Sequence, residues 1–402
     1  MSKQTGAPII YEPGAKTNFT IHSSTDGEIF KLGKLTIEVI HTPGHTLEST
    51  CFLLRDENDK PHAIFTGDTL FVGDVGRPDL SSGNLSSEEL AGILYDTIQD
   101  KILPLADEVI VYPAHGAGSS CGKNIGPNTF STIGEERKVN YALQPQSRET
   151  FIKAVTDGLT EAPKYFSINA HINMEGYESL DDVKQKGLTP LSVDEFKKLI
   201  AEDVLVLDTR HADIFTQGFV PGSIFIGLEG RFAEWAGALL PFDKPMILVT
   251  EIGKEEETVI RLSRVGFDKM QGFLKGSFDA WLSAGEKADL IIDVEADELA
   301  MDIPHDPNLI VIDVRREAEY ANGHVKDALN IPLNDMTDIA LIADFEEKQN
   351  LYVHCAGGYR SVIASSLIKR QGFHNIRNVL GGWTNIKDQE KIVVEKDTSI
   401  LN

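Results

Sequence analysis

The strongest constraint on the fold of this 402-residue chain is an internal repeat in its C-terminal half. VLVLDTR (204–210) returns as VIDVR (311–315), and GFVPGSI returns as GHVKDAL, with equivalent residues 105 positions apart. MILVT and LYVHC end at Thr250 and Cys355, which are also 105 positions apart, and VGFDKM and QGFHNI are 106 apart. Repetition at a fixed period is typical of a duplicated structural unit. Strand-like runs that alternate with helical runs predict an α/β unit in each copy.

In the second copy, Cys355 ends a β-type run and is followed by a glycine-containing loop and an amphipathic helix from about Ser361. The first turn of a helix presents free N–H groups and a partial positive charge, which favour a thiolate. Gly357 and Gly358 allow backbone N–H groups to turn inward, and Arg360 adds a forked cation suited to sulfur oxyanions. This pattern predicts that Cys355 is a catalytic nucleophile. The alternative is a buried cysteine that packs as a small hydrophobic residue.

The segment CAGGYRS, with IDVRREAEYANGHVKDALNIPL before it and NVLGGW after it, resembles the rhodanese family over residues 290–395. The resemblance implies that Cys355 takes sulfur from a persulfide or thiosulfate, holds it as a persulfide and passes it to an acceptor. Asp313, Arg315 and His324 match motifs of the family that we interpret as scaffold. The loop residues that the resemblance assigns to the persulfide and its anion are Ala356, Gly357, Gly358 and Tyr359.

The first copy keeps the repeat but lacks the nucleophile. Thr250 stands at the position of Cys355 and is followed by EIGKEEE, and no cysteine occurs between positions 122 and 354. An acidic loop repels an anionic donor, and no partner base for Thr250 is apparent. We therefore predict an inactive rhodanese-like domain whose role is packing or positioning.

Residues 1–150 alternate short β-rich runs with turns and helical stretches, and polar residues gather at the strand ends. Three motifs there carry ligand-type residues, namely HTPGHT with His45, FTGDTLF with Asp68 and YPAHGAG with His115. Asp and His side chains that converge from several strand ends form zinc or iron sites. The three motifs therefore predict a metal site, although a single histidine is more often a packing or surface residue.

Together the three motifs resemble the metallo-β-lactamase superfamily over residues 1–150. GDTLFVGDVGRPDL, VYPAHGAGSSCGKNIG and STIGEERKVNYAL are similar to its persulfide dioxygenase branch, which occurs in bacteria fused to two rhodanese-like domains. The resemblance implies one non-haem Fe(II) bound by two His and one Asp, with His45 and Asp68 among the ligands and His115 at a second metal position. It also implies oxidation of a low-molecular-weight thiol persulfide by O₂ to sulfite, which leaves as thiosulfate after sulfur transfer.

The family's His-x-His-x-Asp-His motif, which supplies the first metal ligand, is missing ahead of TPGHT, since the sequence opens with MSKQTGAPIIYEPGA. Two interpretations stay open. Either the coding start is misassigned and the ligands lie upstream, or this form is metal-poor and lacks dioxygenase activity. Loss of the strands around the motif is expected to expose apolar sheet surface. The alternative functions are a zinc hydrolase of the glyoxalase II type, and a metal-free scaffold beside a sulfurtransferase that uses only Cys355.

Two further residues close to the metal motifs are candidates for substrate binding. Arg77, in VGRPDL, is expected either to hold a substrate carboxylate or to form a surface salt bridge. Cys121, in GSSCGKN, is expected either to relay sulfur toward Cys355 or to be passive, and Cys51, in STCFLL, belongs to the core. Three scattered cysteines are too few for a disulfide framework and indicate a reducing cytoplasm.

The net charge of −24 argues against nucleic acid and anionic membranes as partners. No stretch approaches the ~20 apolar residues that span a bilayer, and the N-terminus lacks the apolar segment of a signal peptide. The predicted fold is α/β, with an N-terminally incomplete metallo-β-lactamase-like αββα sandwich followed by two rhodanese-like α/β domains. We predict domains at 1–187, 188–287 (inactive) and 288–402 (catalytic), in a cytoplasmic enzyme that the resemblance implies is a homo-oligomer.

Overall fold

The computed structural model describes residues 2–11, 14–80, 85–159, 165–343 and 345–397. The chain divides into two compact units, Met1–Gly176 and Tyr177–Asn402. The sequence placed the first boundary after residue 187, but α6 (Leu180–Gly187) packs on the second unit, where Val183 is buried in its core. None of the described helices is long and apolar enough to cross a membrane.

The first unit is built on a six-stranded sheet with the order β10-β9-β6-β5-β4-β3. Its neighbouring strands are antiparallel, except that β6 and β9 are parallel. Two short strand pairs, β1 with β2 and β7 with β8, complete the β-structure of the described residues of this unit. The strands are β1 (Ile10–Tyr11), β2 (His22–Ser23), β3 (Ile29–Leu32), β4 (Leu35–His41), β5 (Thr50–Arg55), β6 (Pro61–Gly67), β7 (Leu70–Phe71), β8 (Asp74–Val75), β9 (Ile110–Pro113) and β10 (Ser131–Thr132).

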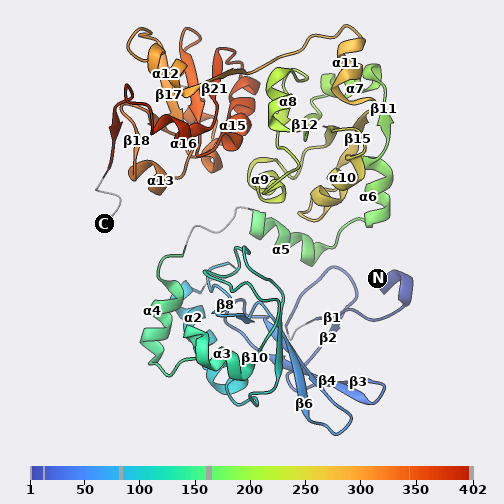
Figure 1. Ribbon diagram of the computed structural model, residues 1–402. Coiled ribbons are helices and arrows are strands. Elements are labelled where there is room, and N and C mark those ends of the chain that lie inside the picture. Colours follow the sequence, from blue (N-terminus) through green and yellow to red (C-terminus); the bar gives the residue numbers. More distant parts are fainter. Residues whose placement is uncertain (1, 12–13, 81–84, 160–164, 344, 398–402) are drawn as a thin grey trace. The chain divides into compact units, whose positions relative to one another are not determined.

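One face of this sheet is covered by helices, which lie together on one side of β4 and β6 in Figure 1. Ser86 and Glu89 form a capping box that begins α2, and a π-helical segment, Ile98–Ile102, continues it. The core between helices and sheet includes Cys51, which is fully buried as predicted. The helices of this unit are α1 (Ser2–Thr5), α2 (Ser87–Thr97), α3 (Ile133–Val139), α4 (Arg148–Thr156) and α5 (Tyr165–Glu175), with a 3₁₀ turn at Tyr141–Leu143.

The opposite face of the sheet carries exposed aromatic side chains. Phe65 is 43% exposed and Tyr112 is 39% exposed, and their rings stack with centroids 5.6 Å apart. Phe130 is 57% exposed and lies 6.1 Å from Tyr112, centroid to centroid. The strand register places Phe65 opposite both Phe52 and Tyr112, so these rings share one face. These rings form an exposed apolar surface on this face of the sheet.

The second unit contains two copies of one parallel five-stranded sheet. The first has the order β11-β15-β14-β12-β13 and the second β16-β21-β20-β17-β19, which is the same order once equivalent strands are matched. The duplicated α/β unit predicted from the 105-residue repeat is thereby confirmed. The strands are β11 (Pro190–Leu191), β12 (Leu205–Asp208), β13 (Ile224–Phe225), β14 (Met246–Val249), β15 (Met270–Leu274), β16 (Ile292–Val294), β17 (Leu309–Asp313), β18 (His324–Val325), β19 (Leu329–Asn330), β20 (Asn350–His354), β21 (Ile376–Val379) and β22 (Val394–Glu395).

In each copy the central strand is buried, except for Asn350 at the start of β20, and ends one residue before Thr250 or Cys355. β14 ends at Val249, ahead of Thr250, and β20 ends at His354, ahead of Cys355. In parallel α/β sheets, ligands bind at the carboxyl ends of the strands. The helices of this unit are α6, α7 (Val193–Ala201), α8 (Ala212–Gln217), α9 (Phe232–Leu239), α10 (Glu255–Ser263), α11 (Ser277–Ser283), α12 (Ala296–Asp302), α13 (Glu317–Ala321), α14 (Ala340–Ala343), α15 (Tyr359–Arg370) and α16 (Gly382–Ile386), with a 3₁₀ turn at Leu333–Asp335.

Helix α15, which follows Cys355, is buried continuously from Ser361 to Lys369. Its own sheet covers one side, and β13 of the first repeat covers another. The Phe225 N–H donates to Ser366 Oγ at 3.0 Å, and the Lys369 ammonium pairs with Asp289 at 2.7 Å. The helix that follows the Cys355 loop is thus part of the contact between the two repeats.

Candidate functional site

Cys355 lies between the carboxyl end of β20 and the amino end of α15, and its side chain is buried. Its Sγ accepts a hydrogen bond from the Gly358 N–H at 3.1 Å, and Ser361 Oγ lies 3.7 Å away. Gly358 has φ +103°, a left-handed conformation that suits glycine and turns its N–H toward the sulfur. The loop therefore gives the sulfur atom one backbone donor and the first turn of a helix.

The backbone of this loop is fixed by the start of α16. The Trp383 N–H donates to the Cys355 carbonyl at 2.6 Å, and the Thr384 N–H and Oγ donate to the Ala356 carbonyl at 3.1 and 3.0 Å. Gly382 has φ +53°, and a Cβ added there would collide with the Cys355 carbonyl oxygen. The NVLGGW motif thus allows α16 to approach the backbone of the catalytic loop closely.

Arg360 is engaged by a carboxylate instead of facing an open anion site. Its two terminal nitrogens donate to the two carboxylate oxygens of Glu319 at 2.8 and 2.9 Å. These hydrogen bonds lower the pKa of Glu319 to about 2, so the pair is fully ionised at neutral pH. From the sequence, Arg360 was expected to suit a sulfur oxyanion, whereas in the structure its terminal nitrogens bind Glu319, which lies 41 residues earlier in the chain.

Beneath the loop, the Asp-x-Arg motif of the second repeat forms a buried ion pair. Arg315 donates through Nε and Nη2 to Asp313 at 3.0 and 2.6 Å, and through Nη2 to the Gly323 carbonyl at 2.7 Å. The guanidinium carbon lies 4.5 Å from the centroid of the Trp383 ring. Nε and Nη2 of Arg315 are thus both engaged within the fold.

The first repeat reproduces this arrangement without the nucleophile. Arg210 donates to Asp208 at 2.9 and 2.6 Å and to the Gly218 carbonyl at 2.9 Å, and its guanidinium carbon lies 4.6 Å from the Phe278 ring centroid. Each of these four residues stands 105 positions before its counterpart. Because the pair persists in a repeat without a cysteine, we assign it to the scaffold.

The loop after Thr250 differs from the loop after Cys355 in its charge and in the residue that contacts its backbone. Glu251 follows Thr250, and α10 begins at Glu255 with three acidic residues in its first turn. Ser277, with φ +58°, donates its hydroxyl to the Thr250 carbonyl at 2.5 Å, in the position that Gly382 occupies in the second repeat. Within the described residues, this loop presents no thiol and no excess of positive charge.

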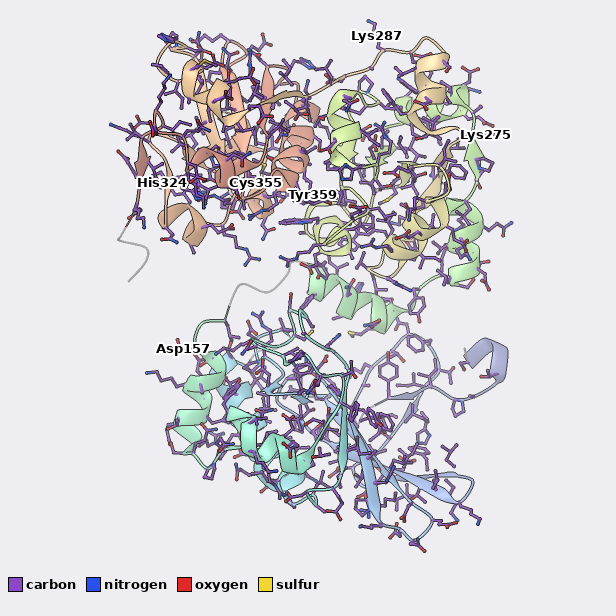
Figure 2. The ribbon with its side chains drawn as sticks, in the orientation of Figure 1. Asp157, Lys275, Lys287, His324, Cys355 and Tyr359 are labelled. Carbon is purple, nitrogen blue, oxygen red and sulfur yellow. The ribbon has the colours of Figure 1, made fainter. Side chains whose placement is uncertain are left out.

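A pocket of about 1060 Å³ opens between the two repeats. The Tyr359 hydroxyl donates to the Gly227 carbonyl of the first repeat at 2.8 Å, and the Tyr359 ring packs edge-on against Phe225. Figure 2 labels Cys355 and Tyr359, with Tyr359 on the side of the second repeat that faces the first. The first repeat therefore forms one wall of the pocket into which Cys355 opens. The wall residues from the first repeat include Gly227, Arg231, Trp235, Glu251 and Arg261, and those from the second include Glu319, Cys355, Gly357, Tyr359 and Arg360.

In the first unit, the predicted metal ligands meet at the ends of the sheet strands. Asp68 follows β6, His115 follows β9, and His45 lies between β4 and β5. Asp68 Oδ2 is 3.6 Å from His45 Nε2, and Asp68 Oδ1 is 3.3 Å from His115 Nε2. Cys121 joins Asp68 and His115 in a group whose ligand atoms all lie within 4.8 Å of one another.

The surroundings of His45 and Asp68 fit a metal ion. His45 Nδ1 lies 2.8 Å from the Arg77 carbonyl, which accepts its proton and leaves the Nε2 lone pair directed at Asp68. Burial lowers the pKa of His45, which keeps the imidazole neutral and able to ligate. A Cβ at Gly76 would collide with the Asp68 carbonyl and press on the His45 ring. Asp68 Oδ1 is buried and makes no hydrogen bond among the described residues, as expected for an oxygen that faces a cation.

Arg77 is a structural residue in this fold. It is 3% exposed, and its Nε and Nη2 donate to the Asp79 carboxylate at 2.7 Å each. Its Nη1 donates to the Ser120 carbonyl at 3.3 Å, and its backbone N–H donates to the Cys121 carbonyl at 3.0 Å. Of the two roles expected from the sequence, the structure thus favours an ion pair, which is buried and fixes the loop that carries Cys121.

Comparison with known proteins agrees with this architecture. The model of the rhodanese-like domain family matches residues 192–284 and 295–389. The solved structure of a metallo-β-lactamase from Staphylococcus aureus is similar, with a TM-score of 0.57 and 28% identity over 68% of this chain and 78% of that chain. The chain is a metallo-β-lactamase-fold domain fused to two rhodanese-like domains. The predicted fold class is therefore confirmed.

Two curated relatives indicate which branches of the metallo-β-lactamase fold are closely related. The mouse mitochondrial persulfide dioxygenase ETHE1 is 31% identical over 149 residues, which are 37% of this chain and 51% of that protein. The hydroxyacylglutathione hydrolase GloC of Haemophilus influenzae is 35% identical over 122 residues, which are 30% of this chain and 47% of that protein. The chain spans about half the length of the curated relatives it matches.

Several residues of the rhodanese-like site were missed from the sequence. Glu319, Gly382 and Trp383 were recognised only as parts of motifs, and the pairing of Glu319 with Arg360 was not predicted. The 105-residue offset contained a signal for Gly382, because its counterpart is Ser277. The wall contributed by the first rhodanese-like domain had no signal in the sequence, since it depends on how the two repeats pack.

Proposed function

We propose that this protein transfers sulfane sulfur through Cys355, taking it from a thiol persulfide and passing it to sulfite. The observation that carries the proposal is the setting of the sulfur atom. Sγ accepts the Gly358 N–H at 3.1 Å at the amino end of α15, and it opens on a pocket of about 1060 Å³. A backbone N–H and the positive end of a helix stabilise negative charge on sulfur.

The reaction proceeds in two balanced steps. The Cys355 thiolate attacks the outer sulfur of R–S–SH, the donor S–S bond breaks, and its electron pair leaves with R–S⁻, which yields Cys355 persulfide. Sulfite then attacks the outer sulfur, the new bond forms thiosulfate, and the electron pair of the broken bond returns to the Cys355 sulfur while the persulfide proton passes to solvent. No external oxidant or reductant is needed. The loop from Ala356 to Tyr359 holds the outer sulfur through its backbone N–H groups.

The pocket supports a thiol carrier as the donor in preference to thiosulfate. Its volume of about 1060 Å³ is at the upper end of small-molecule pockets and much larger than a sulfur oxyanion needs. Arg360, the cation beside the thiol, is already paired with Glu319. The wall from the first rhodanese-like domain presents Arg231 and Arg261 together with Glu251, which suits a carrier with groups of both charges.

The test supplies the full chain with glutathione persulfide and sulfite and measures thiosulfate. We expect Cys355→Ser to lower kcat/KM by at least about 1000-fold, the scale on which loss of a nucleophile acts. Thr250→Ser is the matched control at the equivalent position and retains the wild-type rate. Mass spectrometry of the persulfide-treated wild type finds one added sulfur atom on the peptide that contains Cys355. Thiosulfate production by Cys355→Ser at the wild-type rate contradicts the proposal.

For the metallo-β-lactamase-fold domain we propose a metal-dependent reaction on a sulfur substrate, with oxidation of a thiol persulfide as the first candidate. The similarity to a persulfide dioxygenase and the fusion to a sulfurtransferase support it. Fe(II) bound by His45 and Asp68 would supply the activation of O₂. The chain contributes a His45 imidazole held neutral and oriented by the Arg77 carbonyl, and an Asp68 carboxylate whose oxygens face two histidines.

A zinc hydrolase of the glyoxalase II type is the second candidate, and the similarity to GloC favours it. Metal analysis of the purified chain, an oxygen electrode with glutathione persulfide, and hydrolysis of a glutathione thioester separate the two candidates. Iron with O₂ consumption supports the dioxygenase, and zinc with thioester hydrolysis supports the hydrolase. A chain that binds neither metal and performs neither reaction contradicts both and leaves sulfur transfer at Cys355 as the activity.

A further inference from the structure

The two oxygens of Asp68 face two different ligand positions in the metallo-β-lactamase-fold domain. Oδ2 points toward His45 Nε2 at 3.6 Å, which gives that position two protein ligands among the described residues. Oδ1 points toward His115 Nε2 at 3.3 Å, and Cys121 Sγ completes a group whose ligand atoms lie within 4.8 Å of one another. The second position therefore has three protein ligands, and His45 does not belong to that group.

The loop that carries Cys121 is held in place by residues outside the group. The Cys121 carbonyl accepts the Arg77 N–H at 3.0 Å, and the Cys121 N–H donates to Ser119 Oγ at 3.2 Å. Three residues further on, the Asn124 N–H donates to the Asp74 carboxylate at 2.6 Å. These anchors lie on both sides of the cysteine, so its position is preorganised for a ligand.

One carboxylate oxygen of the group has no hydrogen-bond donor among the described residues, as expected of an oxygen that binds a cation. Asp68 Oδ1 is buried and makes no hydrogen bond among the described residues, although His115 Nε2 is nearby. A buried carboxylate oxygen without a donor is costly, and a bound cation removes that cost. We propose that Cys121, with Asp68 and His115, binds a zinc ion at this second position.

The donor set is consistent with zinc and with a reactive site. Three protein ligands and one open position are the arrangement of catalytic zinc, and thiolate is a ligand that zinc prefers. Binding converts the Cys121 thiol to a thiolate and releases its proton to solvent. Zinc has no redox chemistry, so a site filled in this way supports Lewis-acid chemistry and not activation of O₂. The proposal goes beyond sulfur transfer at Cys355 and is independent of it.

X-ray absorption on the zinc-loaded full chain tests the ligand set directly. We expect one sulfur scatterer at about 2.3 Å beside nitrogen and oxygen at about 2.0–2.2 Å. Cobalt(II) substitution should give a near-ultraviolet thiolate charge-transfer band. Both measurements use a Cys355→Ser background, so that Cys121 and the buried Cys51 are the remaining thiols.

Variants then identify the sulfur and the position. Cys121→Ser in that background should lose the charge-transfer band and bind zinc at least about 10- to 100-fold more weakly in competition with a chelator, since even outer-shell partners contribute that much. His115→Gln should weaken binding similarly, whereas His45→Gln should leave the band and most of the affinity. Circular dichroism confirms that each variant is folded.

Three outcomes overturn the proposal. The first is zinc bound without a sulfur scatterer when Cys121 and the other residues of the metallo-β-lactamase-fold domain are unchanged. The second is a band that survives Cys121→Ser, and the third is loss of zinc from His45→Gln but not from His115→Gln. Sulfur transfer assayed on the chain that retains Cys355, with and without zinc, stays independent of zinc, so failure here is distinguishable from failure of the function proposed for Cys355.

Discussion

The two rhodanese-like domains share a scaffold and differ at the site. Both have a five-stranded parallel sheet of the same order, and both bury an Asp-x-Arg pair with nearly identical distances. At the end of the central strand, one has Thr250 followed by an acidic loop, and the other has Cys355 followed by glycines and Arg360. The comparison teaches that the buried ion pair belongs to the shared scaffold, whereas the loop and the residues that contact it distinguish the two sites.

The difference extends to residues that contact the loop. Ser277 of the first domain donates its hydroxyl to the Thr250 carbonyl, whereas Gly382 of the second lets α16 approach the Cys355 carbonyl. Glu319, which pairs with Arg360, has an exposed isoleucine as its counterpart 105 residues earlier. A single substitution in the loop of the first domain would therefore not recreate the site.

The largest effect is expected when a thiol is moved between the domains. In a Cys355→Ser background, Thr250→Cys should restore no sulfur transfer, and kcat/KM should stay at least about 1000-fold below wild type, because the acidic first turn of α10 disfavours a thiolate at this position. Thiosulfate formation from persulfide and sulfite measures it, with Thr250→Cys alone as the control that keeps the wild-type rate. Restored transfer would show that the thiol, and not its loop, is the missing element.

The shared ion pairs should be equally important for folding. Arg210→Met and Arg315→Met each leave a buried aspartate unpaired and should lower the free energy of unfolding by about 3–5 kcal/mol. Urea unfolding followed by circular dichroism measures both. If one of the two substitutions leaves the free energy of unfolding nearly unchanged, the ion pair does not stabilise that domain. The two domains would then differ in their scaffold as well as in their loops.

A smaller effect is expected when the close approach of α16 to the Cys355 carbonyl is disturbed. Gly382→Ala combines a left-handed φ with a collision against the Cys355 carbonyl and should cost about 2–3 kcal/mol of stability together with part of the activity. Gly372→Ala is the matched control, because its φ is +96° and its Cβ would meet open space. It should cost about 1 kcal/mol and preserve sulfur transfer. Equal losses of activity in the two variants would exclude a role for the close approach.

The smallest effect is expected from Glu319→Gln. Because the carboxylate is about a third exposed, the pair with Arg360 should stabilise the protein by only about 1 kcal/mol at pH 7. The pKa of Glu319 falls to about 2 in the folded state, below the ~4.3 of a free glutamate, so its contribution is complete above about pH 4.3 and disappears as the pH falls toward 2. Urea unfolding of wild type and variant at pH 7 and pH 3 measures this dependence.

The same substitution frees the Arg360 guanidinium for anions. With thiosulfate as donor, Glu319→Gln should lower KM several-fold while kcat changes little. Glu317→Gln, at an exposed position of the same helix, is the control and should change neither KM nor stability. An unchanged KM would show that Arg360 does not face the donor in either state.

The sequence predicted the duplicated fold, the strand–loop–helix around Cys355 and the grouping of His45, Asp68 and His115, because these follow from periodicity and local motifs. It did not predict that Arg360 is paired or that Arg77 is buried, because both facts depend on carboxylates placed by the local fold. The contact of Cys121 with the metal ligands also depends on a loop path that no local pattern specifies.

The burial of α15 has a consequence for the role of the first rhodanese-like domain. Because α15 is buried from Ser361 to Lys369, other elements must pack around it on every side. β13, the edge strand of the first rhodanese-like domain, is one of these elements. Deleting that neighbour would expose the middle of the helix that positions the thiol, together with Lys369, whose partner Asp289 precedes the second sheet. The first domain therefore supplies bulk on which the helix after Cys355 depends, although it has no cysteine of its own.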